Sequence, residues 1–282
     1  MEDYEAFDEK QKAQIRLGLK KGLDVSVYAK PEFSQSQMEQ IRRGLEKGLD
    51  VSVYAAEFNA EQLEQIRWGL EENFDVSVYA KPEFSVAQMA QIRFGFMKGL
   101  DVSAYAKTEF NCFQMDEIRL GLMRGLDVSL YARPEFDNVQ MKQIKIGLTE
   151  GLDASVYAKP EFNWQQMARI RYGLKKGLDV SVYAKPEFTI AQMEQIGIGL
   201  EEGLDASVYA KPEFDDWQMY EIRKGLEKGL DVSVYAKPEL TDKLMKEIRE
   251  NLEKGLDVSD LLPLSAKIDA WCEQENEEDH ER

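Results

Sequence analysis

The chain is one unit of 26 residues written ten times, with a single step that is one residue short. The phrase Gly-Leu-Asp-Val-Ser-Val-Tyr-Ala-Lys-Pro-Glu-Phe, or a near copy, recurs through almost the whole sequence. A repeat of this length is typical of solenoids, in which each unit buries its apolar face only against its neighbours. We therefore expect residues 1–259 to form a tandem-repeat solenoid with polar end units. Residues 260–282 are expected to form a C-terminal capping helix and an acidic tail.

Each unit carries a strong signal for the start of a helix. We number a unit from its Phe, as in Phe33 to Glu57. Position 2 is Ser, Thr, Asn or Asp in all ten copies, and position 5 is Gln in nine, which together form a capping box. Met38 and Ile41 then begin an apolar helix face that ends near Gly48. Gly44 lies inside this helix, so we expect a neighbouring helix to approach it closely.

The second element of the unit, residues 49–55, has two possible structures. Apolar and polar residues alternate along it, as in a strand, so an α/β solenoid resembling leucine-rich repeats is one alternative. Leu49 and Tyr54, however, flank Asp50 as a second hydrophobic staple around a second cap, and this favours a short helix. The sequence thus predicts an all-α, right-handed superhelical solenoid of ten helix-turn-helix repeats.

The charge of the chain restricts its partners. Lys and Arg number 36 and Asp and Glu 53, which gives a net charge of −17. Such a surface repels phosphate backbones, so we expect no direct binding of nucleic acid. The simplest interpretation is that the charge maintains solubility. A more specific interpretation is that the chain binds a basic protein or imitates a nucleic acid. No apolar run approaches the roughly 18 residues that a membrane span needs.

The cysteines and the first residues predict a cytoplasmic location. Cys112 and Cys272 lie far apart and are expected to be reduced thiols. The start of the chain lacks the charged and apolar regions of a secretory signal.

The sequence lacks the usual signals of catalysis. The one histidine, His280, lies near the C-terminus, and no phosphate-binding, nucleophile-elbow or CxxC motif occurs. Arg42, Asp50, Ser52 and Tyr54 recur in nearly every copy, and we expect them to form an internal hydrogen-bond ladder rather than ten active sites. We therefore expect no enzymatic activity, no cofactor and no metal site.

Positions 3, 7, 11 and 14 form one stripe of the helix, apart from the apolar core face. This stripe is mostly polar in the end units and becomes apolar in the central ones. We call its apolar part, with one bordering residue, the ridge, and we expect it to bind a partner. Its ten residues are Trp68, Val86, Phe94, Phe113, Leu120, Ile146, Trp164, Tyr172, Ile190 and Ile198. A second internal core and a self-association surface are the alternatives.

The units of the form Gln-Met-x-x-Ile-Arg-x-Gly-Leu-x-x-Gly-Leu-Asp-Val-Ser-x-Tyr-Ala resemble tandem arrays of poorly characterised proteins of Firmicutes and their mobile elements. The resemblance covers residues 7–259 and implies a bacterial or phage cytoplasm, without an activity or assigned residues. Tetratricopeptide and HEAT arrays suggest protein binding by analogy. We therefore expect a scaffold, monomeric or weakly dimeric, that binds a protein or peptide through the ridge. An acidic mimic of nucleic acid and a self-assembling element are the alternative functions.

Overall fold

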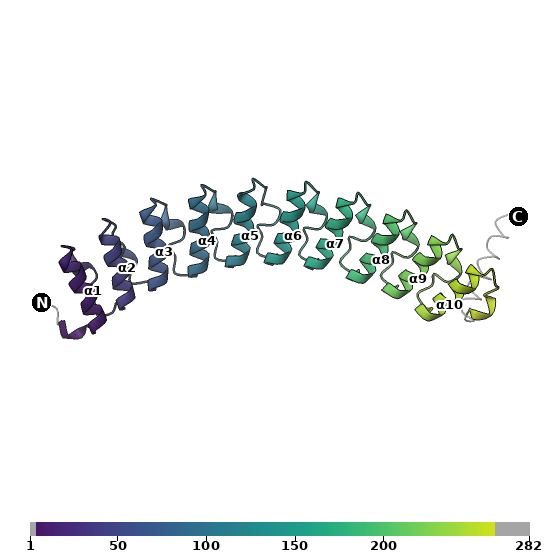
Figure 1. Ribbon diagram of the computed structural model, residues 1–282, viewed down its shortest axis with the longest axis horizontal. Coiled ribbons are helices and arrows are strands. Elements are labelled where there is room, and N and C mark those ends of the chain that lie inside the picture. Colours follow the sequence, from purple (N-terminus) through teal and green to yellow (C-terminus); the bar gives the residue numbers. More distant parts are fainter. Residues whose placement is uncertain (1–3, 263–282) are drawn as a thin grey trace. The chain divides into compact units, whose positions relative to one another are not determined.

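The computed structural model describes residues 4–262 and contains only helices in that range (Figure 1). Each repeat consists of one long α-helix followed by a short segment, so the predicted α-solenoid is confirmed and the α/β alternative is wrong. The contacts divide the chain into two compact units, residues 1–149 and 150–282, and each is described by itself.

In the first unit the long helices pack in chain order, each against the next. They are α1 (Glu9–Lys20), α2 (Gln35–Leu45), α3 (Ala60–Glu71), α4 (Val86–Met97), α5 (Cys112–Leu122) and α6 (Asn138–Thr149). The short segments are single 3-10 turns, η1 (Tyr4–Ala6), η2 (Val25–Val27), η3 (Ser52–Tyr54), η4 (Val76–Val78) and η5 (Val102–Ala104).

The second unit repeats this arrangement. Its long helices are α7 (Trp164–Lys175), α8 (Ile190–Glu201), α9 (Asp216–Glu227) and α10 (Asp242–Glu253). Its 3-10 turns are η6 (Ala154–Val156), η7 (Val180–Val182), η8 (Ala206–Val208), η9 (Val232–Val234) and η10 (Ser259–Leu261). The expected capping helix and acidic tail, with Cys272 and His280, lie outside the described residues, apart from the η10 turn.

The predicted helix starts are present. In α4 the Ser85 hydroxyl accepts from the Gln88 backbone N–H, and the Gln88 side chain accepts from the Ser85 N–H at 2.8 Å. The Gln88 amide group also has a second role, because its Nε2 donates to the Phe110 carbonyl of the next repeat at 2.7 Å. One side chain therefore caps its own helix and fastens the following repeat.

The predicted second cap is also present, and it precedes a 3-10 turn rather than an α-helix. The Asp24 carboxylate accepts from the Ser26 backbone N–H at 3.0 Å and from the Ser26 hydroxyl at 2.6 Å. A residue with positive φ follows the end of each long helix within three residues, and it is Gly48 (75°) after α2 and Asn73 (58°) after α3. Asn is the non-glycine residue that most readily adopts this conformation.

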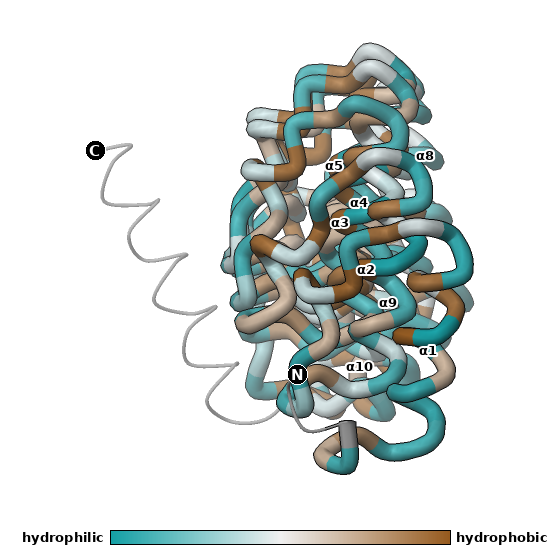
Figure 2. Tube along the Cα trace, turned by 90° about the vertical axis from the view of Figure 1, so that its left-hand side faces the viewer, coloured by the Kyte–Doolittle hydropathy of each residue, from teal (hydrophilic) through white to brown (hydrophobic). Residues whose placement is uncertain are grey.

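Within each unit the core lies between a long helix, the segment that follows it and the next long helix. Hydrophobic and hydrophilic residues alternate along the tube (Figure 2). Met89, Ile92 and Tyr105 are fully buried. The close approach predicted at the inner glycine exists, but the atom that approaches is a tyrosine hydroxyl and not another α-helix. A Cβ at Gly95 would overlap the Tyr105 hydroxyl, which donates to the Gln91 carbonyl at 3.2 Å.

Candidate functional site

The recurring arginine forms the predicted internal ladder. In five repeats its Nε donates to a glutamine side chain 27 or 28 residues earlier, on the preceding long helix. Arg42 thus bonds to Gln14 at 2.9 Å, and Arg119 bonds to Gln91 at 2.9 Å. Because each bond joins two repeats, this arginine has a structural role.

Where the arginine is replaced, its partner is replaced as well. Lys145 forms an ion pair with Glu117 at 2.5 Å in the first unit. In the second unit Gly197 takes the arginine position and Arg169 takes the glutamine position. A Cβ at Gly197 would overlap the Arg169 guanidinium, so Arg169 fills the space that the glycine leaves. In these two cases the replacements are complementary, while Glu221 takes the glutamine position and still accepts from Arg249 Nε of the last repeat at 2.7 Å.

The ridge of the first unit lies at the molecular surface. Phe94 on α4 is 40% exposed, and Phe113, in the first turn of α5, is 66% exposed. The other four residues are half-buried: Trp68 on α3, Val86 on α4, Leu120 on α5 and Ile146 on α6. None of the six is buried, in contrast to the core residues of the same helices, so this part of the ridge does not form a second core.

The ridge of the second unit has the same character. Trp164 and Tyr172 on α7 are exposed, at 45% and 39%, and Ile190 and Ile198 on α8 are half-buried. Trp217, in the first turn of α9, is 63% exposed and lies 6.3 Å from Tyr220, measured between ring centroids.

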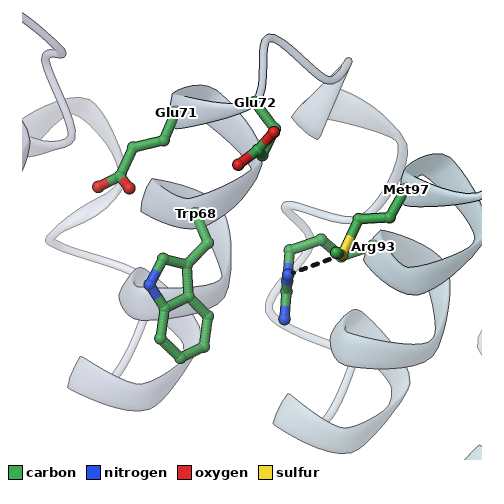
Figure 3. A pocket seen from close by; sticks show the side chains of 5 residues that line it. All are labelled: Trp68, Glu71, Glu72, Arg93 and Met97. Carbon is green, nitrogen blue, oxygen red and sulfur yellow. Dashed lines mark hydrogen bonds between the residues drawn. The ribbon is translucent and has the colours of Figure 1, made fainter.

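Within the first unit, the Arg93 side chain lies near both Trp68 and Phe94, and Figure 3 shows it beside Trp68. The Arg93 guanidinium on α4 lies 5.0 Å from the ring centroid of Trp68 and 5.0 Å from that of Phe94. These distances are within the range of cation–π attraction. Trp68, Glu71, Glu72, Arg93 and Met97 line a shallow hollow of ≈ 190 Å³, with the two carboxylates at one end of it.

Arg93 differs from the arginines of the two neighbouring repeats because no carboxylate forms an ion pair with it. Arg67 is paired with Glu71, four residues later, and with Glu64, three residues earlier. At Arg93 these two positions are Met97 and Ala90. Arg93 Nη1 contacts the Met97 sulfur at 3.4 Å and Nε donates to Gln65 at 3.0 Å, and among residues 4–262 no carboxylate forms an ion pair with it.

The electrostatics of Arg93 follow from this environment. Burial lowers the pKa of the Arg93 guanidinium, because the charge loses water without gaining a paired carboxylate; Tyr79, Glu72 and Glu64 oppose the shift from a distance. Arg119 on α5 lies 5.9 Å from the Phe94 centroid and keeps a carboxylate through Asp116 at 2.5 Å. Within the first unit's part of the ridge, Arg93 is therefore a desolvated cation without a carboxylate partner.

Sequence reasoning assigned the arginine to the ladder and did not place it in the ridge. The structure shows that Arg93 does both, since Nε donates to the Gln65 side chain and the guanidinium lies within cation–π distance of two ridge rings. The signal in the sequence was the replacement of Glu by Met97 and Met123 at position 14 of two central repeats. Met97 and Met123 are themselves exposed, at 52% and 46%.

Other site chemistry is limited in the part of the chain that the structure describes. Cys112 is a free, half-buried thiol. Between residues 4 and 262 no group of three His, Cys, Asp or Glu side chains is placed to hold a metal ion. No helix in the same range is both long and apolar enough to cross a bilayer.

Comparison with known proteins leaves the function to be argued from the chain itself. No protein-family model matches the sequence, and no curated protein or solved structure is significantly similar to it.

Proposed function

We propose that this chain is a non-enzymatic repeat scaffold that binds a protein or peptide through the ridge. The observation that carries the proposal is a contrast between two sets of positions. Core residues such as Met89 and Ile92 are nearly the same in every repeat and are buried. Ridge residues vary from repeat to repeat and are exposed or half-buried. Stacking requires the first set, and it does not require the second.

The distribution of exposed apolar side chains supports this function. Large exposed apolar residues concentrate on the ridge or beside it, where they include several aromatic rings. They are Phe94, Met97, Phe113, Met123, Trp164, Tyr172 and Trp217. Contiguous apolar patches with aromatic and arginine anchors are common at protein interfaces. The hollow at Trp68 is smaller than the ~300–1,000 Å³ of small-molecule pockets, which favours a macromolecular partner.

The test compares three proteins as immobilised bait: the wild type, a Phe94→Glu/Tyr172→Glu ridge variant and a Val53→Glu control. Val53 is an apolar side chain outside the ridge and is 71% exposed. A ridge partner is captured by the wild type and the control and is lost by the ridge variant. Captured proteins that bind all three baits equally contradict the proposal.

Two further measurements separate the alternatives. An acidic mimic of nucleic acid predicts binding that weakens steeply with salt and is indifferent to the ridge variant, whereas apolar contacts predict weak salt dependence. Self-assembly predicts that light scattering gives the mass of a dimer for the wild type and the mass of a monomer for the ridge variant.

A further inference from the structure

The unpaired arginine of the ridge indicates what kind of segment the ridge accepts. Arg93 lies 5.0 Å from the ring centroids of both Trp68 and Phe94, and it has no ion-pair partner among the described residues. Two of its nitrogens already have partners inside the protein, since Nε donates to Gln65 and Nη1 contacts the Met97 sulfur. Nη2 has no hydrogen-bond partner among residues 4–262 and retains donor capacity, because a guanidinium has five N–H groups in a fixed fork.

We propose that the ridge around Trp68 and Phe94 binds an apolar segment of a partner protein that carries an Asp or Glu side chain, and that Arg93 receives this carboxylate. The inference rests on the proposed function and specifies its partner. A partly buried charge without a counter-ion is an unfavourable arrangement, and a carboxylate brought by the partner removes the penalty. The rings of Trp68 and Phe94, each 5.0 Å from the guanidinium, offer apolar contact beside that ion pair.

The repeats on either side show why Arg93 is the position that accepts the carboxylate. Arg67 is already neutralised by Glu71, and Glu71 in turn also pairs with Lys47 at 2.7 Å. Arg119 is neutralised by Asp116. Only at Arg93, within the three repeats that form this surface, are both intrahelical carboxylate positions taken by Ala90 and Met97.

Glu72 is the group that could favour the opposite chemistry, a partner cation. It lines the same hollow and belongs to no ion pair among the described residues. Its side chain is exposed, however, so its charge is hydrated and gains little from a partner. The charge of −17 attracts a basic partner at long range, and Arg93 selects a carboxylate at short range. The expected segment is thus compatible with a protein of basic overall charge.

The experiment begins with a selection of phage-displayed random linear peptides on the wild-type chain. Enriched peptides are synthesised, and their binding is compared with that of matched peptides in which each Asp or Glu becomes Asn or Gln. The protein variants are Met97→Glu, which restores the ion pair seen at Arg67, and Met97→Leu, which changes the side chain without adding charge. Met97→Glu introduces a pair that other repeats already contain, so the fold is expected to be retained.

The expected result is enrichment of peptides with an acidic residue beside apolar ones. Amidation of that residue, or Met97→Glu, should weaken binding roughly tenfold to hundredfold, the range of one charge-assisted hydrogen-bonded pair, while Met97→Leu leaves it unchanged. Enriched peptides that lack an acid, or that bind Met97→Glu as well as the wild type, overturn the carboxylate inference and leave the ridge function standing. Basic peptides whose binding is lost in Glu72→Gln overturn it too. Peptides that bind the Phe94→Glu variant normally, or no enrichment at all, contradict the ridge function itself.

Discussion

The Arg169 guanidinium occupies the space that a side chain at Gly197 would fill, one repeat further along the chain. At the same two positions elsewhere, glutamine receives a hydrogen bond from arginine, as in Gln14 and Arg42 at 2.9 Å. The long side chain has therefore moved from one helix to its neighbour, and the space between the helices stays filled. Arg169 Nη2 donates to the Glu194 carbonyl at 3.1 Å, so the inverted pair also joins the two repeats.

The first prediction concerns this exchange. Gly197→Arg places a second guanidinium where Arg169 already lies, and we expect a loss of about 1–3 kcal/mol in the free energy of unfolding. Adding Arg169→Gln recreates the glutamine–arginine pair of the other repeats and should restore most of that loss. Urea unfolding followed by circular dichroism measures both variants. Arg169→Gln alone is measured as well. If the double variant loses as much free energy of unfolding as the two single variants lose together, this would falsify the pairing.

The second prediction concerns the glutamine of the capping box. Glutamate is a normal substitute for glutamine in an isolated capping box, because it accepts the same backbone N–H. Gln88, however, also donates from Nε2 to the Phe110 carbonyl at 2.7 Å, and a carboxylate cannot donate. We expect Gln88→Glu to cost about 1–3 kcal/mol, since it leaves a carboxylate against a carbonyl oxygen. Gln88→Ala provides the comparison, and a Glu variant as stable as the wild type shows that the bond between repeats contributes nothing.

Local signals made much of the fold predictable from the sequence. A cap, a glutamine three residues later and a terminal glycine specify most of the long helices, and these features act within a few residues of one another. The sequence predicted a hydrogen-bond ladder through the arginine but not its partner, because Arg42 and Gln14 lie 28 residues apart and either could face solvent in a single repeat. The matched replacements at Glu117 with Lys145 were the available sign of that contact.

The same reasoning explains what was predictable of the candidate site. Helical periodicity correctly separated the face that contains Phe94 from the core face that contains Ile92. It did not identify Arg93, because a guanidinium has several donors and can serve the ladder and the surface together. Helical periodicity assigns each residue to one face of the helix. It does not show that a long side chain such as that of Arg93 contacts two faces.

The third prediction separates the ridge from the core by stability. Phe94 is 40% exposed, and we expect Phe94→Ala to cost about 1 kcal/mol or less, as surface substitutions do. Phe110 is fully buried in the next repeat, and Phe110→Ala should cost about 3–5 kcal/mol through loss of burial and a cavity. Denaturant unfolding of the two variants makes the comparison. Equal losses contradict the assignment of Phe94 to a free surface.

The last prediction concerns the buried tyrosines and alkaline pH. Burial raises the pKa of Tyr183 to about 12 and also raises the pKa of Tyr79, because the folded protein disfavours a buried phenolate. Since the folded pKa exceeds the unfolded value near 10, the stability linked to each tyrosine is fully present below pH 10. It is lost as the pH rises toward the folded pKa, by about 1.4 kcal/mol per pH unit for each such tyrosine. We therefore expect the free energy of unfolding to fall steeply between pH 10 and about 12.

Two phenylalanine variants test this origin of the pH dependence. The Tyr79 hydroxyl donates to the Gln65 carbonyl at 3.1 Å, whereas the buried Tyr183 hydroxyl has no hydrogen-bond partner among the described residues. At neutral pH we expect Tyr79→Phe to cost about 0.5–1.5 kcal/mol and Tyr183→Phe to cost nothing or to stabilise the protein. Above pH 10 each variant has one ionisable tyrosine fewer, so its stability should fall less steeply than that of the wild type by the contribution of one tyrosine. A slope that neither substitution changes assigns the alkaline transition to other groups, and lysine side chains are the ones that titrate in the same range.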